Sequence, residues 1–214
     1  MDMFGTMINF FQDGGLFMYP IALVAALGIA VAIERYYYLW HTESANRRVW
    51  SEVAPFLGQG DYRRALAATT DSRSAIGQIL SYGLARVQNT RRRDDVEKAM
   101  EESLMEIVPR LERRTHYLAS FANIATLLGL LGTIIGLIQA FQAVGAANPA
   151  EKAELLSASI SVAMNTTAFG LIVAIPLLLL HSVLQSKTTQ IVDSLEMASV
   201  KFLNTVVERR PEAA

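Results

Sequence analysis

The third apolar segment of this chain contains the run Asn165-Thr166-Thr167-Ala168-Phe169-Gly170-Leu171. The segment occupies residues 157–184, which at 1.5 Å per residue is long enough to cross a hydrocarbon core of about 30 Å. Inside such a helix a carboxamide and two hydroxyls must each find a hydrogen-bond partner or a wet cavity. The run therefore predicts a membrane-spanning helix that carries a polar feature near mid-depth.

Two further apolar segments, at residues 16–40 and 118–144, predict two more spans. The first ends in Tyr36-Tyr37-Tyr38-Leu39-Trp40, an aromatic belt that is typical of a membrane interface. Outside the spans the apolar residues keep a helical spacing, and strand-like alternation is absent. We therefore expect an all-α membrane protein with three transmembrane helices. Two of them extend far into the cytoplasm, beside a helical cytoplasmic loop domain.

The basic residues predict the orientation of these spans. Residues 41–116 hold 13 of the 19 Lys and Arg residues, and the tail after the third span holds four more. Because loops rich in Lys and Arg stay in the cytoplasm, we expect a periplasmic N-terminus and a cytoplasmic C-terminus. Lipid is expected around the spans.

Four parts flank the three spans. They are an interfacial segment at residues 1–15, a cytoplasmic helical region at 41–117, a short periplasmic loop at 145–156, and a cytoplasmic helix and tail at 185–214. Asp61 is expected to cap a helix in the cytoplasmic region. The helix that begins near Asp94 is expected to run without a glycine into the second span, with Pro109 as its weakest point.

Composition excludes several classes of function. The chain is 52% hydrophobic with a mean hydropathy of +0.28, which indicates a few spans joined to a sizeable polar portion. A net charge of −1 gives no electrostatic basis for binding nucleic acid. The absence of cysteine excludes disulfides and thiol chemistry. No nucleophile–base pair, metal cluster or phosphate loop is visible, so we expect neither an enzyme nor a bound cofactor.

Small residues in the second and third spans indicate close helix packing. Gly129, Gly132 and Gly136 share one face of the second span, at positions i, i+3 and i+7. Small residues let membrane helices approach closely. In the third span we assign Gly170 to the same role, together with Pro176, which loosens the helical backbone.

Polar residues on faces of the same two spans are candidates for an ion path: Thr126, Thr133, Ser161, Asn165, Thr166 and Thr167. Each hydroxyl can instead donate to the carbonyl four residues earlier in its own helix, as Ser and Thr often do in membranes. A polar face on two spans favours the path. His181 is expected to lie at the interface rather than in a proton relay. The spans hold almost nothing that titrates, so any titrating group must come from elsewhere.

At these residues the chain resembles the MotA/TolQ/ExbB proton-channel family, and most of all its three-span ExbB/TolQ branch. The matching stretches are Leu127–Gly136 and Thr166–Pro176, with Ile33-Glu34-Arg35 at the end of the first span. The resemblance implies a homo-oligomer, a pentamer in this family, whose second and third spans line a central lumen. Thr133 and Thr167 match the family's lumen-facing threonines.

The resemblance also implies partners. A single-span protein of the ExbD/TolR type, with an aspartate in its membrane segment, would occupy the lumen. The coupling ion would pass between that aspartate and the hydroxyls, and force would reach the envelope through a TonB- or TolA-like protein. The implied function is an inner-membrane motor subunit that turns the ion-motive force into transport or envelope maintenance.

One position departs from the family pattern. Many relatives carry a glutamate five residues before the threonine of the third span, and this chain has Val162 there. The partner's aspartate would then carry all the charge switching. Hydroxyl and amide oxygens also suit a hard cation, so Na⁺ is an alternative to the H⁺ that we favour.

Other functions remain open at this point. A membrane scaffold that stabilises a partner and conducts nothing would also be compatible with the missing glutamate. A flagellar-type stator shares the two motifs but normally has four spans. A gliding-type Na⁺-driven motor subunit is a further alternative. A secondary transporter would need inverted repeats, which are not visible.

Overall fold

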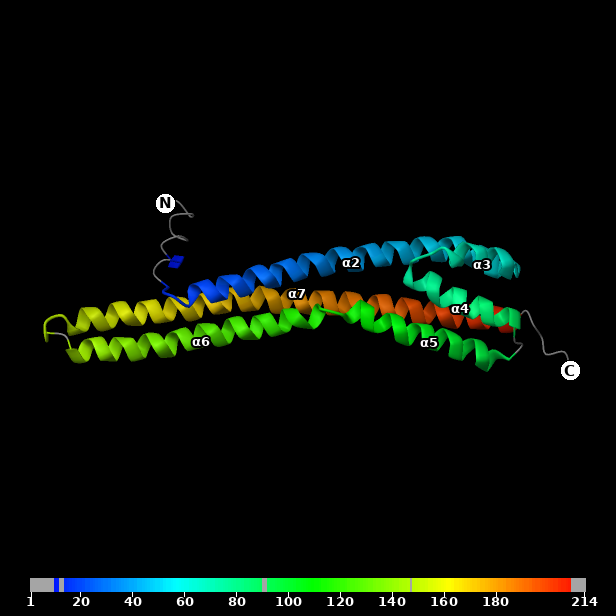
Figure 1. The fold of residues 1–214 in the computed structure, drawn as a ribbon. Helices are drawn as coiled ribbons and strands as arrows, with labels where there is room; N and C mark the ends of the chain where they lie inside the picture. The colour runs from blue at the N-terminus through cyan, green and yellow to red at the C-terminus, as the bar shows by residue number, and fades with distance from the viewer. Residues whose placement is uncertain (1–9, 12–13, 90–91, 147, 209–214) are drawn as a thin grey trace. The chain divides into compact units, whose positions relative to one another are not determined.

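The computed structural model describes residues 10–11, 14–89, 92–146 and 148–208. Across these residues the order of elements is α2 (Met18–Gln59), α3 (Tyr62–Thr70), α4 (Ala75–Asn89), α5 (Arg93–Glu112), α6 (Thr115–Ala146) and α7 (Lys152–Glu208), with no strand (Figure 1). Three stretches are long and apolar enough to cross a membrane, within Met18–Gln59, Arg93–Gly145 and Lys152–Val206. The prediction of an all-α protein with three spanning helices is confirmed.

The chain divides into two compact units. The apolar unit comprises Met1–Glu34 and Arg114–Val183, and the charged unit comprises Arg35–Arg113 and Leu184–Ala214. Helices α2 and α7 each give their first part to the apolar unit and their second part to the charged unit.

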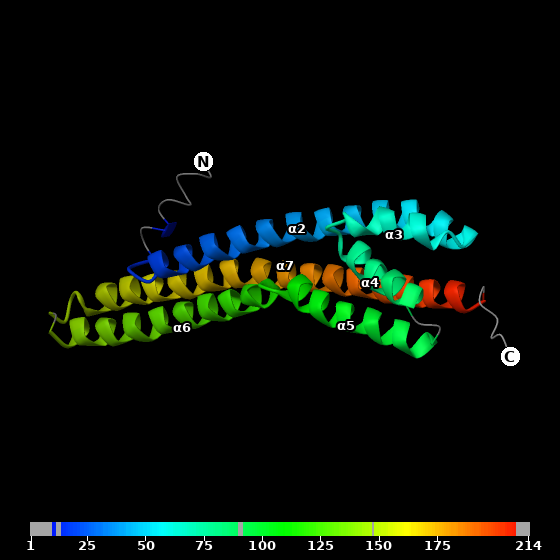
Figure 2. The same cartoon turned by 45° about the vertical axis from the view of Figure 1, so that its right-hand side comes forward.

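In the apolar unit, α6 lies alongside the first part of α7 (Figures 1 and 2). Most of the residues buried in these two helices are small, although Leu118 and Leu177 are also buried, and many of the large apolar residues are exposed. Buried are Ala122, Ala125, Ala140, Ala163 and Ala174, whereas Leu127, Phe141, Ile172 and Leu179 are exposed. A soluble protein buries its large apolar residues, so this inverted arrangement is that of helices surrounded by lipid or by further copies.

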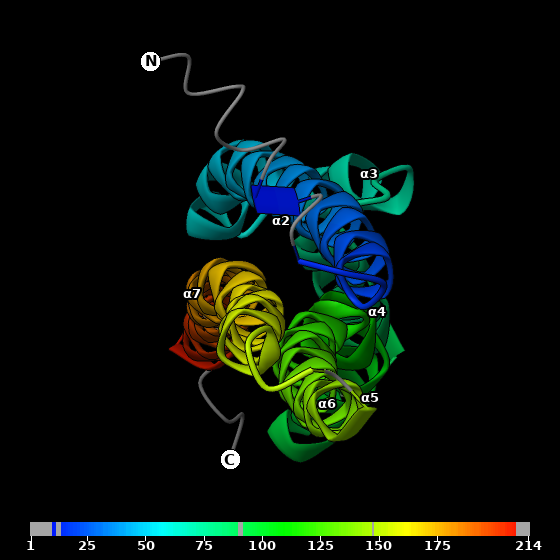
Figure 3. The same cartoon turned by 90° about the vertical axis from the view of Figure 1, so that its left-hand side faces the viewer.

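The first part of α2 belongs to the same unit, and the end-on view shows the three helices α2, α6 and α7 (Figure 3). A Cβ at Gly28 would lie 2.7 Å from Cδ2 of Leu177, so the glycine makes room for that leucine. Just before α2, Gly15 takes a φ of +74°, a conformation that favours glycine. The predicted interfacial segment at residues 1–15 otherwise falls mostly outside the described residues.

The charged unit is built from α3, α4 and α5 with the second parts of α2 and α7. Gly83 of α4 lies where a Cβ would be 2.7 Å from the sulfur of Met100 and 2.9 Å from Cε1 of Phe202. Phe202 and Met100 are almost fully buried, so three helices meet in this core. The predicted cap is confirmed, since Oδ1 of Asp61 accepts a hydrogen bond from the backbone N–H of Arg64 at 3.1 Å.

An ion pair joins α2 to α7 in the charged unit. The ammonium of Lys187 lies 2.7 Å from a carboxylate oxygen of Glu43, and Arg47 approaches the other oxygen at 3.0 Å. The hydrogen bond from Lys187, outside the predicted spans, holds the pKa of the Glu43 carboxyl below its usual value.

The expected continuous helix from Asp94 into the second span is wrong. Helix α5 ends at Glu112, α6 begins at Thr115, and Arg114 between them has a φ of +69°. Pro109 lies inside α5 and does not mark the break. On one side of the break, the Arg35 guanidinium donates to the carbonyl of Leu111, and on the other, Arg114 pairs with Glu34 at 3.6 Å. These contacts offset the cost of about 1 kcal/mol for an arginine in the left-handed region.

Candidate ion path

Thr133 of α6 and Thr167 of α7 meet in the apolar unit. Their hydroxyls hydrogen-bond to each other, although 34 residues separate them in the sequence. Thr167 also reaches the carbonyl oxygen of Gly129 at 2.8 Å. The Thr133 hydroxyl lies 3.3 Å from the carbonyl oxygens of both Gly129 and Ala163. We call these two residues the threonine pair.

The threonine pair has more acceptors than protons. Each hydroxyl has one proton to donate and two lone pairs with which to accept. When Thr167 donates to Gly129 and Thr133 donates to Thr167, both lone pairs of Thr133 stay available. The pair can therefore accept a proton-bearing group or offer oxygen to a cation without leaving any of its own protons unbonded.

Close packing of glycines positions the threonine pair. A Cβ at Gly129 would lie 3.2 Å from Cα of Thr167 and 3.3 Å from Cα of Gly170. A Cβ at Gly170 would lie 2.7 Å from the carbonyl oxygen of Ala125. Only residues without a side chain let the two backbones come this close, and that approach brings Thr167 within reach of the Gly129 carbonyl.

The other glycines of the predicted packing face also lie against α7. A Cβ at Gly136 would be 2.9 Å from Cβ of Ala163, and one at Gly132 would overlap the methyl group of Thr166. Pro176 lies within α7 with an exposed side chain, and the helix continues through it.

Thr166 points to a different neighbour. It is 2% exposed, and its hydroxyl donates to the carbonyl of Gly14 at 2.6 Å and lies 3.0 Å from the carbonyl of Val162. A Cβ at Gly15 would be 3.2 Å from Cγ1 of Val162. Phe11 packs edge-on against Phe169 in the same region, with ring centroids 5.8 Å apart. This face of α7 thus contacts the segment that precedes α2.

The remaining candidates are not brought to the threonine pair within one chain. Asn165 precedes Thr167 by two residues, which places it about 200° around the helix, and it is half-buried. Ser161 and Thr126 are exposed, and Thr126 donates to the carbonyl of Ala122 at 3.1 Å. Thr126, Thr133 and Thr166 therefore all lie within bonding distance of the carbonyl four residues earlier. Only the threonine pair also joins the two spans. The part of these residues in an ion path stays a prediction.

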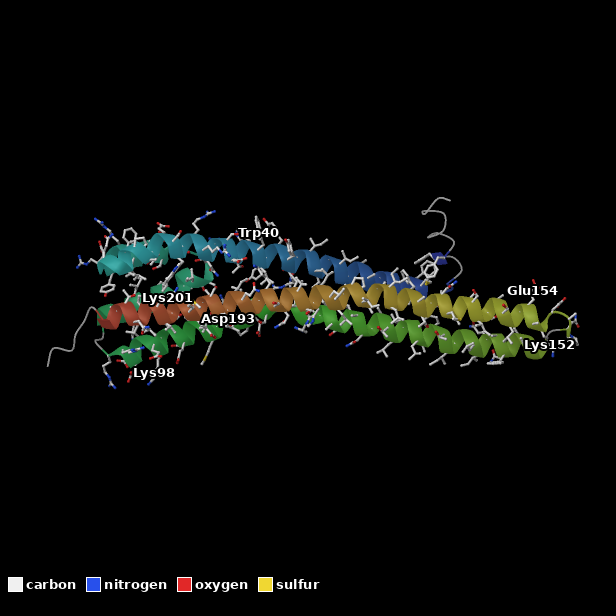
Figure 4. All side chains as sticks on the ribbon, turned by 180° about the vertical axis from the view of Figure 1, so that it is seen from behind. Trp40, Lys98, Lys152, Glu154, Asp193 and Lys201 are labelled. Carbon is white, nitrogen blue, oxygen red and sulfur yellow. The ribbon has the colours of Figure 1, made fainter. Side chains whose placement is uncertain are left out.

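The described parts of α6 and α7 around the threonine pair carry no fixed charge. Helix α6 contains no Asp, Glu, Lys or Arg, and in α7 the first such residue after Glu154 is Lys187. Lys152 and Glu154 lie at the start of α7 (Figure 4). Val162, in the position discussed above, faces the segment before α2 and lies about 140° around α7 from Thr167. The two helix faces that form the threonine pair are thus polar and carry no charged residue.

Comparison with known proteins identifies the family of the chain. Residues 71–197 match the model of the MotA/TolQ/ExbB proton channel family. The chain belongs to this family. A protein of Methanothermobacter thermautotrophicus described as a biopolymer transport protein ExbB homolog is 31% identical over 195 residues, which cover 91% of this chain and 68% of that protein. The matched region contains both members of the threonine pair.

Membership of this family supports a subunit of an ion-driven channel or motor. Sequence reasoning did not find the contact between Thr166 and Gly14, or the use of the Gly129 carbonyl as a shared acceptor. Thr166 and Gly14 are 152 residues apart in the chain, so no local pattern could have paired them.

Proposed function

We propose that this chain is the ion-path subunit of a motor complex in which H⁺ flow drives mechanical work on the cell envelope. The threonine pair carries the proposal, because it places two hydroxyls between two apolar helices at a point where α6 and α7 carry no charged residue. In a medium without water, hydroxyls are stable only when they are hydrogen-bonded. In this proposal they also form hydrogen bonds with a charged or protonated group of a partner as the ion crosses the membrane.

The charge that switches belongs to a partner in this proposal. The threonine pair cannot titrate in the physiological range, and Val162 occupies the position where many relatives have a glutamate. A single-span protein of the ExbD/TolR type with an aspartate in its membrane segment would supply the carboxylate. Its neutral form crosses an apolar level more readily than its charged form, which couples proton binding to movement. A TonB- or TolA-like protein would carry the force outward.

Several copies of the chain are needed. Two packed helices cannot enclose a path, so the lumen must lie between copies, and the family resemblance indicates five. The large exposed apolar residues on α6 and α7 are available for contacts with lipid and with neighbouring copies. Ser161, Asn165 and Thr126 are secondary candidates for the lumen because they are polar and not fully buried in one chain.

The proposed orientation follows the basic residues. Seventeen of the 19 Lys and Arg residues lie in residues 41–116 and after the third span, which supports a cytoplasmic charged unit and a periplasmic N-terminus in a bacterial inner membrane. In this setting, one charge that crosses 100 mV supplies about 2.3 kcal/mol for work. The chain acts by coupling and performs no covalent chemistry.

The native mass of the purified protein tests the assembly. We would measure it in detergent, alone and after co-expression with a single-span protein that carries a membrane aspartate. The proposal expects a pentamer that takes up partner chains, and H⁺ flux when the complex is placed in liposomes. Na⁺ flux at constant pH, without H⁺ flux, would show that the coupling ion is Na⁺ and not H⁺. A monomer or dimer that binds no such partner would contradict a lumen between copies and would favour a non-conducting scaffold.

A further inference from the structure

A cleft in the charged unit lies between α2 and α7, and Ile76 at the start of α4 also lines it. Its volume is about 370 Å³, and the lining residues on which its chemistry depends are Glu43, Asn46, Arg47, Trp50, Met197 and Lys201. The α7 residues run from 190 to 201, about 17 Å along the helix. We call it the α2–α7 cleft. It lies outside the three predicted spans, and neither the proposed ion path nor the family match assigns it a role.

A buried amide in the wall of the cleft lacks a partner. Asn46 is 5% exposed, and its Oδ1 accepts a hydrogen bond from the backbone N–H of Ile76 at 3.2 Å. That bond fixes the orientation of the amide, because the nitrogen cannot accept from an N–H. The Nδ2 atom of Asn46 is buried and has no acceptor. A buried donor of this kind costs about 1–3 kcal/mol, so an acceptor that reaches it from the cleft binds favourably.

The charges around the cleft favour an acidic ligand. Glu43 is already engaged by Lys187 and Arg47. Lys201 forms no ion pair with any residue in the described ranges, and its side chain is exposed at the far end of the cleft (Figure 4). Arg47 is also largely exposed at the near end. Lys201 is therefore the lining cation without a carboxylate partner among the described residues, at an opening whose lining carboxylate, Glu43, is already paired.

The apolar surface continues beyond the cleft. Ile76, Ile191 and Ala198 are buried behind it. Met197 lines it while 57% exposed, and Val200 on the same helix is 53% exposed. Flexible methionine side chains adapt to varied apolar partners. A surface that extends past the cleft along one helix fits a peptide better than a small molecule.

We propose that the α2–α7 cleft docks an acidic, amphipathic peptide segment of a partner protein. An acceptor of the peptide bonds Asn46, its apolar residues cover Met197 and Trp50, and its carboxylates lie near Lys201 and Arg47. This is the helix-in-groove mode of recognition, in which apolar positions recur every three or four residues.

The test uses the full chain in detergent with Trp40 replaced by Phe, which leaves Trp50 as the single tryptophan. The probe is a labelled synthetic peptide of about 12 residues, with leucines at helical spacing and glutamates elsewhere. A control peptide has lysine in place of every glutamate. Binding is read from the anisotropy of the peptide and from the emission of Trp50.

The expected result is binding of the acidic peptide only, with a shift in Trp50 emission and weaker binding at high salt. Lys201→Glu should weaken the affinity about three- to tenfold, whereas Lys98→Glu, an exposed lysine on α5, should leave it unchanged. Asn46→Asp keeps the acceptor for Ile76 and removes the donor, so binding should fall at least about tenfold with helicity retained.

Three outcomes would overturn the proposal. They are equal binding of the basic peptide, no binding of either peptide, and an affinity that Lys201→Glu does not change. A disulfide between copies through a cysteine placed at Met197 would instead show that a second copy of the chain covers the cleft. Variants of the threonine pair should bind the peptide normally, so this test is independent of the ion path.

Discussion

Replacing Gly170 with alanine should separate α6 from α7 and disable the threonine pair. The added Cβ would lie 2.7 Å from the carbonyl oxygen of Ala125 and 3.1 Å from Cα of Gly129. Both contacts are with backbone, so no side chain can turn away. Ordinary contact begins at 3.4 Å, which requires the helices to move apart by roughly 0.5 Å or more.

The free-energy cost has two parts. Overpacking of this kind costs about 1–3 kcal/mol. The same movement lengthens the bond from Thr167 to the Gly129 carbonyl from 2.8 Å to roughly 3.3 Å, which forfeits most of a bond worth about 0.5–1.5 kcal/mol. The better helix propensity of alanine returns about 1 kcal/mol. The net loss in the free energy of unfolding should therefore be about 1–3 kcal/mol.

Gly145→Ala is the matched control. Gly145 is exposed in the last turn of α6, and an added Cβ there meets nothing within 4 Å. That variant should be neutral or slightly more stable. Unfolding in detergent, followed by circular dichroism, should separate the two variants by about 1–4 kcal/mol, and ion flux should fall only for Gly170→Ala. Equal stability and equal flux of the two variants would refute the reasoning.

Three further predictions concern single side chains. Thr166→Val should lower the free energy of unfolding by about 1–2 kcal/mol and make the segment around Gly14 easier to cleave with protease, whereas Thr166→Ser should restore both, because the buried Gly14 carbonyl then regains its donor. Asp61→Ala should cost about 1 kcal/mol through loss of the α3 cap, measured by thermal unfolding, and an unchanged melting curve would contradict it. The lowered pKa of Glu43 gives stability above the unfolded pKa of about 4.3, and this is lost as the pH falls through the folded pKa. Glu43→Gln should therefore reduce the fall in melting temperature as the pH is lowered below the unfolded pKa of Glu43. An unchanged slope of melting temperature against pH would show that the ion pair with Lys187 does not contribute to stability.

The three spanning helices were predictable because long apolar runs have few other stable arrangements. The glycine face of α6 and the hydroxyls of Thr133 and Thr167 were visible as patterns within single helices. Their bond to each other was not, because it depends on the axial register of two helices whose residues are 34 apart in the chain. Helical periodicity predicts which face of a helix a residue lies on, but it does not predict which residue of a neighbouring helix lies at the same axial position.

The break after α5 shows another limit of the sequence. Glycine and proline normally mark such points, but Arg114 takes the left-handed conformation here and Pro109 does not end the helix. The contacts that offset this conformation come from Glu34 and Arg35, far away in sequence. Asn165 was also predicted to belong to the ion path, but it precedes Thr167 by two residues. Its side chain therefore lies on the opposite side of α7 from Thr167.

Proton uptake into liposomes tests the central claim most directly. The complex of this chain with its single-span partner would be reconstituted around a pH-sensitive dye, and uptake driven by a membrane potential of about 100 mV would be recorded. We predict that Thr133→Val and Thr167→Val each lower uptake at least about tenfold, equivalent to about 1.4 kcal/mol, while Thr167→Ser stays near the original rate. Normal uptake by both valine variants, in complexes of unchanged mass, would contradict the account.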